Sequence, residues 1–214
     1  MTNNGRKCAV IGYGSWATAI VKILTENGVR VGWHILNPEV LASVADEGRN
    51  CKYLRDAELD RSLIEATPDV NEAVAGAETV VLAMPSAFLK RVLEPLAEPL
   101  LDKVVVSAVK GIVPDDFLSV AEYVSRRYGV PESQMAIVTG PSHAEEVGMG
   151  RLSYLTAVCR DGTTRRSIGA MFERPYIRVS CSDDIYMRWR WDWPSGWVTA
   201  TTSWRCSYRT ARPR

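Results

Sequence analysis

The chain has 214 residues and carries 26 Lys and Arg against 25 Asp and Glu, for a formal net charge of +1. This balance excludes a strong overall attraction to nucleic acid or to an anionic membrane. No apolar run approaches the roughly 18 residues that a membrane-spanning helix needs, and residues 1–7 are polar, unlike a signal peptide. We therefore expect a soluble, cytoplasmic protein with no nucleic-acid partner and no stable membrane insertion.

The cysteines and histidines give no sign of a metal site. Five cysteines form no C-x-x-C pair, and the only histidines are His34 and His143. Cys8 and Cys159 fall in predicted strands, where a thiol packs as a small apolar group. We predict no bound metal.

A glycine-rich turn lies near the start of the chain, between a predicted strand and a predicted helix. An apolar strand over residues 7–11 runs into Gly12-x-Gly14-x-x-Ala17, and helical periodicity begins at once. In a dinucleotide-binding turn, the first glycine allows the tight bend, the second lets the backbone approach a diphosphate, and a small third residue lets the helix pack closely. The diphosphate would lie on the free N–H groups of the helix that starts near Ser15. The alternative is a purely structural turn.

The second predicted strand, residues 29–35, leads to the position that meets the adenosine ribose in such folds. An acidic residue there favours NAD and an arginine favours NADP. This chain has Leu36 and Asn37, so neither rule applies. The cofactor is predicted as NAD or NADP, with the choice left open.

Strands and helices alternate along the rest of the chain. We predict further strands over 63–66, 78–84, 103–109, 135–138, 154–159 and 176–180, and helices over 40–47, 69–75, 87–97, 115–128 and 163–172. This order predicts an α/β fold, a doubly wound, mostly parallel sheet with helices on both faces. Ligands of such sheets bind at the carboxyl ends of the strands.

Three loops come after strands at that edge. The first contains Pro85. The second contains Lys110, whose charge could polarise a substrate carbonyl or hold a phosphate, although it could also be a solvated surface lysine. The third, from Gly140 to Ser142, offers N–H groups and a hydroxyl to an anion. Ser142 could equally cap a helix in a capping box with Glu145.

His143 comes directly after that third loop. It could act as a general acid or base. No acidic partner is evident nearby in the sequence, which favours an exposed residue in the first turn of a helix.

Four segments, residues 10–19, 84–86, 107–112 and 139–146, together resemble bacterial NAD(P)-dependent glycerol-3-phosphate dehydrogenase, in that family's order and over about residues 6–186. The resemblance implies a Rossmann-type domain that takes part in reducing dihydroxyacetone phosphate to sn-glycerol 3-phosphate for phospholipid synthesis. It implies cofactor contacts at Ser15, Trp16 and Ala144, contact with both cofactor and substrate at Lys110, and substrate contacts at Gly140 and Ser142. The family's adenosine contact falls at Leu36. The complete predicted cofactor set is Gly12, Gly14, Ser15, Trp16, Leu36, Pro85, Lys110 and Ala144.

The last 28 residues do not fit the family. Residues 187–214 hold five of the seven tryptophans and six arginines against one acidic residue, without helix or strand periodicity. Interleaved Arg and Trp could bind nucleic acid or a membrane surface. We instead interpret this tail as an out-of-frame translation, because back-translation in another frame permits family-like residues.

We therefore expect a dinucleotide-binding domain over 1–186 and an irregular tail over 187–214. The family's C-terminal all-helical domain, with its proton-donor lysine, would be missing. Such a chain should bind cofactor with impaired catalysis. The alternatives are a non-catalytic nucleotide-binding or association module, and a related reductase with the same cofactor domain. A homo-oligomer is left open.

Overall fold

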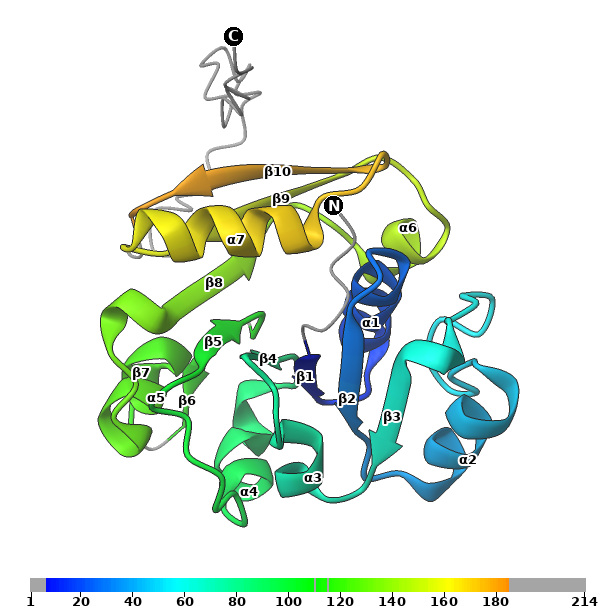
Figure 1. The fold of residues 1–214 in the computed structure, drawn as a ribbon, viewed down its shortest axis with the longest axis horizontal. Helices are drawn as coiled ribbons and strands as arrows, with labels where there is room; N and C mark the ends of the chain where they lie inside the picture. Colours follow the sequence, from blue (N-terminus) through cyan, green and yellow to red (C-terminus); the bar gives the residue numbers. More distant parts are fainter. Residues whose placement is uncertain (1–6, 110, 115, 185–214) are drawn as a thin grey trace, which may run out of the picture.

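The computed structural model describes residues 7–109, 111–114 and 116–184, which form one eight-stranded sheet flanked by helices (Figure 1). The strand order is β10-β9-β8-β5-β4-β1-β2-β3. The strands of this sheet are β1 Lys7–Ile11, β2 Arg30–His34, β3 Ile64–Thr67, β4 Thr79–Leu82, β5 Val104–Ser107, β8 Met135–Thr139, β9 Ser153–Val158 and β10 Ile177–Ser182.

Most of the sheet is parallel. β1 pairs in parallel with both β2 and β4, and the parallel pairing extends to β3 on one side and to β5 and β8 on the other. β9 pairs antiparallel with β8, and β10 runs parallel to β9. The carboxyl ends of the six parallel strands therefore meet at one side of the sheet, the carboxyl edge. The chain winds away from β1 in both directions, so the carboxyl end of β1 is the topological switch point of the sheet, the place where ligands of such folds bind.

Helices cover both faces. They are α1 Ser15–Glu26, α2 Pro38–Glu47, α3 Val70–Val74, α4 Leu89–Leu93, α5 Val120–Tyr128, α6 Ala144–Gly148 and α7 Gly162–Phe172, with short 3-10 helices η1 Arg61–Leu63, η2 Ser86–Phe88 and η3 Glu132–Gln134. Buried residues of α1, α2, α6 and α7 join one core, and those of α3, α4 and α5 join the other.

Strand β1 shows why two cores form. Cys8 and Val10 contribute to the first core, while Ala9 and Ile11 contribute to the second. All four side chains are buried because successive residues of a strand point to opposite faces and both faces are covered. The predicted doubly wound, mostly parallel architecture is confirmed.

The helix predicted over 115–128 is wrong in its first part. Instead, β6 Ile112–Val113 pairs antiparallel with β7 Leu118–Ser119, and α5 begins only at Val120. Ser119 caps α5: its hydroxyl accepts from the backbone N–H of Glu122, and the Glu122 carboxylate accepts from the backbone N–H of Ser119. This capping box fixes the start of the helix.

The helix predicted over 87–97 is shorter than expected. It divides into η2 and the five-residue α4, whose C-cap is Glu94. Pro95 comes directly after this cap, and a proline disfavours helical conformation in the residue before it. Asn71 on α3 then holds the continuing chain by accepting from the N–H groups of Ala97 and Glu98.

Within the described ranges, no helix combines the length and apolarity needed to cross a membrane. The predicted tail, residues 187–214, lies outside the described residues.

Candidate functional site

The glycine turn between β1 and α1 lies at the centre of the carboxyl edge. Gly12 has φ +117°, and a Cβ there would come within 2.3 Å of the carbonyl oxygen of Ala83, just after β4. Both the backbone conformation and the close approach of the neighbouring strand therefore require glycine. Ala17, three residues into the helix, is fully buried against the sheet.

Gly14, unlike Gly12, is not crowded by a neighbouring strand. A Cβ at Gly14 would meet nothing within 4 Å, so the space beside it is open. Gly14 is the N-cap of α1, and no side chain caps this helix. The N–H groups of the first turn, beginning at the half-buried Ser15 and Trp16, therefore lack a capping partner among the described residues.

The carbonyl groups of the turn are all bound by protein groups. The Trp33 indole N–H donates to the Gly12 oxygen at 2.7 Å, and the Asn50 amide donates to the Tyr13 oxygen at 3.0 Å. The Gly14 oxygen accepts from the hydroxyl of Thr18 at 3.0 Å and from its backbone N–H at 2.9 Å. Sequence reasoning missed Trp33 and Asn50, because their partners lie 21 and 37 residues away.

The loops after β4 and β5 lie next to each other. Pro85 is exposed on the first, and a Cβ at Gly111 on the second would lie 3.4 Å from the hydroxyl oxygen of Ser86. The structure thus brings two of the predicted loops together. Lys110, predicted to contact both cofactor and substrate, lies outside the described residues.

The loop after β8 is held against β9. A Cβ at Gly140 would lie 2.3 Å from the Tyr154 carbonyl oxygen, and the Ser142 hydroxyl donates to that same oxygen at 2.7 Å. The alternative interpretation of Ser142 as the N-cap in a capping box with Glu145 is wrong, because α6 begins one residue later than that interpretation requires. The N-cap of α6 is His143, which is exposed and makes no side-chain cap.

Ala144, a predicted cofactor contact, begins α6. Its side chain is 8% exposed and packs in the core shared with α1. Any contact with a ligand at the carboxyl edge would therefore use its backbone.

The adenosine end of the predicted site lies just beyond β2. Leu36 is 49% exposed and brings no charge to this position. His34, the last residue of β2, is buried, and its Nδ1 has no hydrogen-bond partner among the described residues. Burial lowers the pKa of His34, although a hydrogen bond to the Pro68 backbone and the charge of Asp69 act in the opposite direction. His34 therefore brings a buried, unpartnered ring nitrogen, and not an exposed one, to the end of β2.

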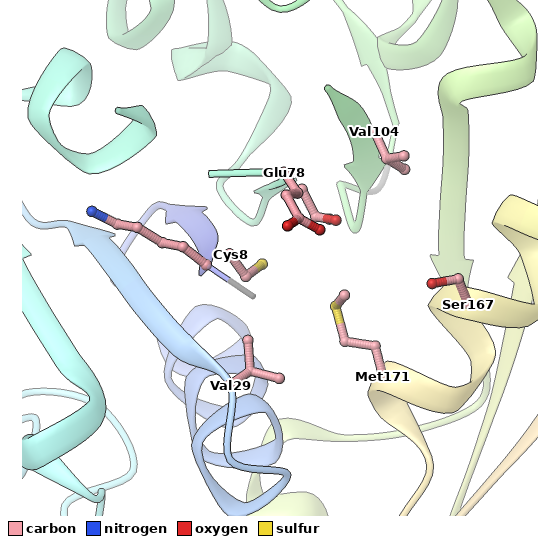
Figure 2. A pocket seen from close by; sticks show the side chains of 8 residues that line it. Cys8, Val29, Glu78, Val104, Ser167 and Met171 are labelled. Carbon is pink, nitrogen blue, oxygen red and sulfur yellow. The ribbon is translucent and has the colours of Figure 1, made fainter. Parts of the chain in front are cut away.

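A pocket of about 140 Å³ lies elsewhere, at the amino ends of β1, β4 and β5 beside α7 (Figure 2). The side chains of Cys8, Glu78 and Met171 point toward one another in it (Figure 2). Burial raises the pKa of the Cys8 thiol to about 12, so the thiol stays protonated and unreactive. This pocket is on the opposite edge from the glycine turn and brings no predicted site residue together.

The N-terminus of α1 is suited to an anionic group. An uncapped helix N-terminus carries free N–H groups and a partial positive charge, which together stabilise phosphate groups. The open space at Gly14 would admit a diphosphate to those groups.

Comparison with known proteins agrees with this geometry. Residues 7–165 match the family described as the NAD-dependent glycerol-3-phosphate dehydrogenase N-terminus. A glycerol-3-phosphate dehydrogenase (NAD(P)+) from Alcanivorax borkumensis is 33% identical over 187 residues, covering 87% of this chain and 54% of that protein. One from Corynebacterium jeikeium is 36% identical over 180 residues, covering 83% of this chain and 53% of that protein.

Solved structures show the same fold. Glycerol-3-phosphate dehydrogenase from Coxiella burnetii superimposes with a TM-score of 0.75 at 23% identity, covering 84% of this chain and 55% of that one. The Saccharomyces cerevisiae enzyme gives a TM-score of 0.74 at 23% identity, covering 84% and 57%. The chain spans about half the length of the curated relatives that it matches. It belongs to the NAD-dependent glycerol-3-phosphate dehydrogenase family and corresponds to the N-terminal part of that family's proteins.

Proposed function

We propose that this domain binds NAD or NADP, with the diphosphate on the first turn of α1. The observation that carries the proposal is the uncapped helix N-terminus beneath the open space at Gly14. Ser15 and Trp16 would contact the diphosphate through their N–H groups. Leu36, just beyond β2, would line the adenosine side. Pro85, on the loop after β4, would contact the cofactor on the other side of β1, and Ala144 would contribute its backbone.

The proposed substrate pair is dihydroxyacetone phosphate and sn-glycerol 3-phosphate, bound by Lys110, Gly140 and Ser142. When bound, the reduced nicotinamide supplies the hydride that converts a ketone to an alcohol. Because the Ser142 hydroxyl already donates to Tyr154, this side chain can offer the substrate only its oxygen lone pairs. A substrate phosphate would therefore be held by backbone N–H groups of this loop and by the charge of Lys110.

We propose that these 214 residues, assayed by themselves, bind the dinucleotide but turn over substrate slowly. They span about half of their relatives' length, and general acid catalysis and substrate positioning each contribute several powers of ten to a rate. We further propose a domain boundary near residue 186, an out-of-frame origin for residues 187–214, and a cytoplasmic location. The nucleotide sequence around codons 186 and 187 tests the out-of-frame origin: a natural reading frame that encodes the tail would contradict it.

Titration of the purified chain with NADH and NADPH, followed by calorimetry, tests the cofactor proposal. We expect saturable one-to-one binding of at least one of them. Oxidation of NADH in the presence of dihydroxyacetone phosphate should remain close to the background without protein. Absence of binding would contradict the first proposal, and rapid turnover would contradict the second.

A second candidate is a non-catalytic association module. Phe117, at φ +52° on the hairpin after β5, is 80% exposed, and Phe88 on η2 is 46% exposed. Exposed aromatic side chains favour association with another apolar surface. Size-exclusion chromatography coupled to light scattering, with and without NADH, distinguishes the two candidates. Discrete oligomers that are unaffected by NADH would favour the association module.

A further inference from the structure

We infer that Asn50 is a positioning residue for dinucleotide binding, acting through the carbonyl groups of the glycine turn. The inference rests on the proposed cofactor function and adds a residue that does not itself face the ligand. Asn50 is fully buried, although it lies in the connection between α2 and η1, whose sequence is typical of a polar loop.

The Asn50 amide uses all its main bonding positions within the protein. Its NH₂ group donates to the Tyr13 carbonyl at 3.0 Å and to the Thr18 hydroxyl at 2.9 Å. Its oxygen accepts from the backbone N–H groups of Lys52 and Tyr53, both at 3.1 Å. One side chain thus joins the glycine turn, the first turn of α1 and the loop 50–54.

Trp33, Asn50 and Thr18, together the carbonyl anchors, bind the three successive carbonyl oxygens of residues 12, 13 and 14. A peptide group's N–H points away from its carbonyl, because the group is planar and trans. Holding these oxygens toward the protein therefore directs the next N–H groups along the chain, those of Tyr13, Gly14 and Ser15, away from the anchors. A carbonyl that rotated outward would place negative partial charge beside the diphosphate.

The loop 50–54 is itself held on its far side. The Tyr53 ring lies 6.5 Å from the Tyr13 ring. Leu54 adopts φ +51°, an uncommon conformation for leucine, and its Cδ1 would lie 3.4 Å from a Cβ at Gly148 on α6. The loop thus extends from the glycine turn to α6, the helix that begins just after Ser142, so Asn50 is anchored on a supported segment.

Asn50→Asp is the primary test. It keeps the oxygen that accepts from Lys52 and Tyr53 but replaces the donor to Tyr13. The matched control is Asn71→Asp on the opposite face of the sheet. Asn71 donates one bond, to the Pro95 carbonyl, and, like Asn50, accepts from two backbone N–H groups, those of Ala97 and Glu98. Calorimetric titration with NADH at a temperature where all variants are folded measures the affinity.

We expect Asn50→Asp to weaken NADH binding at least tenfold and Asn71→Asp to change it less than twofold. If wild type binds NADH and Asn50→Asp binds it within twofold as tightly, this inference is overturned while the cofactor proposal stands. Wild type that does not bind would overturn the cofactor proposal and this inference with it.

If Asn50→Asp does not fold, two substitutions of Thr18, the side-chain partner of Asn50, test the inference instead. Thr18→Ser keeps the hydroxyl that accepts from Asn50 and donates to Gly14, while Thr18→Val keeps only the shape. Thr18→Ser should bind NADH within twofold of the wild-type affinity. Thr18→Val should bind NADH at least fivefold more weakly, although the two variants have similar melting temperatures. Equal affinities in this pair would contradict a positioning role.

Discussion

The indole N–H of Trp33 and the carbonyl oxygen of Gly12 lie 2.7 Å apart, and both residues are buried. The hydrogen bond joins the second strand to the turn that ends the first. Because a buried carbonyl without a donor costs about 1–3 kcal/mol, Trp33→Phe should lower the free energy of unfolding by an amount in that range. Urea denaturation measures the loss.

The same variant should also bind NADH more weakly. Tyr128→Phe is its control, since it removes the hydroxyl that donates to Leu93 at 3.0 Å on the opposite face of the sheet. We expect the control to lose stability while keeping its affinity for NADH. Loss of affinity in both variants to the same degree would show that stability, and not the turn, governs binding.

Gly12→Ala should be among the most damaging single substitutions in the domain. Its methyl group would lie 2.3 Å from the Ala83 oxygen, in a backbone conformation that alanine avoids. Strain and overpacking each cost about 1–3 kcal/mol, so we expect a loss of roughly 3 kcal/mol or more, or failure to fold. Gly28→Ala separates the contributions, because Gly28 has φ +72° but open surroundings. Thermal unfolding of both should rank Gly12→Ala as clearly worse.

Gly14→Ala should leave stability nearly unchanged but weaken NADH binding. The added methyl group meets no protein atom within 4 Å, so the melting temperature should change little. It would occupy the space proposed for the diphosphate, and NADH affinity should fall about tenfold, or about 1.4 kcal/mol. Calorimetric titration measures this, and unchanged affinity would place the diphosphate elsewhere.

Glu26, at the end of α1, should make stability depend on pH in the acid range. Burial alone would raise the pKa of Glu26, but hydrogen bonds from Lys22 and Tyr176 and the charges of Lys22 and Arg174 lower it overall. A lowered folded-state pKa contributes stability above the ordinary glutamate value, about 4.3, and this contribution is lost as pH falls through the folded pKa.

Glu26→Gln should therefore melt below wild type at pH 7, and the difference should shrink as the pH falls below about 4.3. Glu58→Gln serves as the control, because the Glu58 side chain is 80% exposed and forms one surface ion pair with Arg49. Melting curves between neutral and acid pH check this. A difference that stays constant with pH would argue against an ionised Glu26 as the cause.

The fold could be predicted largely because its signals are local. The apolar strand before Gly12, the small Ala17 and the buried strand around Val80 and Val81 are each recognisable within a few residues. The reversal of β9 could not be predicted, since alternation of apolar residues is the same in parallel and antiparallel strands. The hairpin before α5 was missed although the capping signal Ser119-x-x-Glu122 is visible in the sequence.

The candidate site was less predictable than the fold. Gly12 and Gly14 are defined by backbone conformation and open space, which the glycine pattern indicates directly. Asn50 and Trp33 each reach the glycine turn through a hydrogen bond to a backbone carbonyl far away in the sequence. In the sequence they look like any asparagine of a polar loop and any buried aromatic residue. The bond from the Ser142 hydroxyl to Tyr154 could not be predicted, because its acceptor lies 12 residues away on another strand.

The reversed direction of β9 determines at which edge of the sheet β10 ends. β10 runs in the same direction as β9, and its last residue, Ser182, lies level with Val158 and, across β9, with Ile137 in the middle of β8. The polypeptide thus leaves the sheet travelling away from the glycine turn. Any later segment that supplies a side chain to the dinucleotide must reverse course and cross back over the strands, a distance of about 3.3 Å for each strand residue passed.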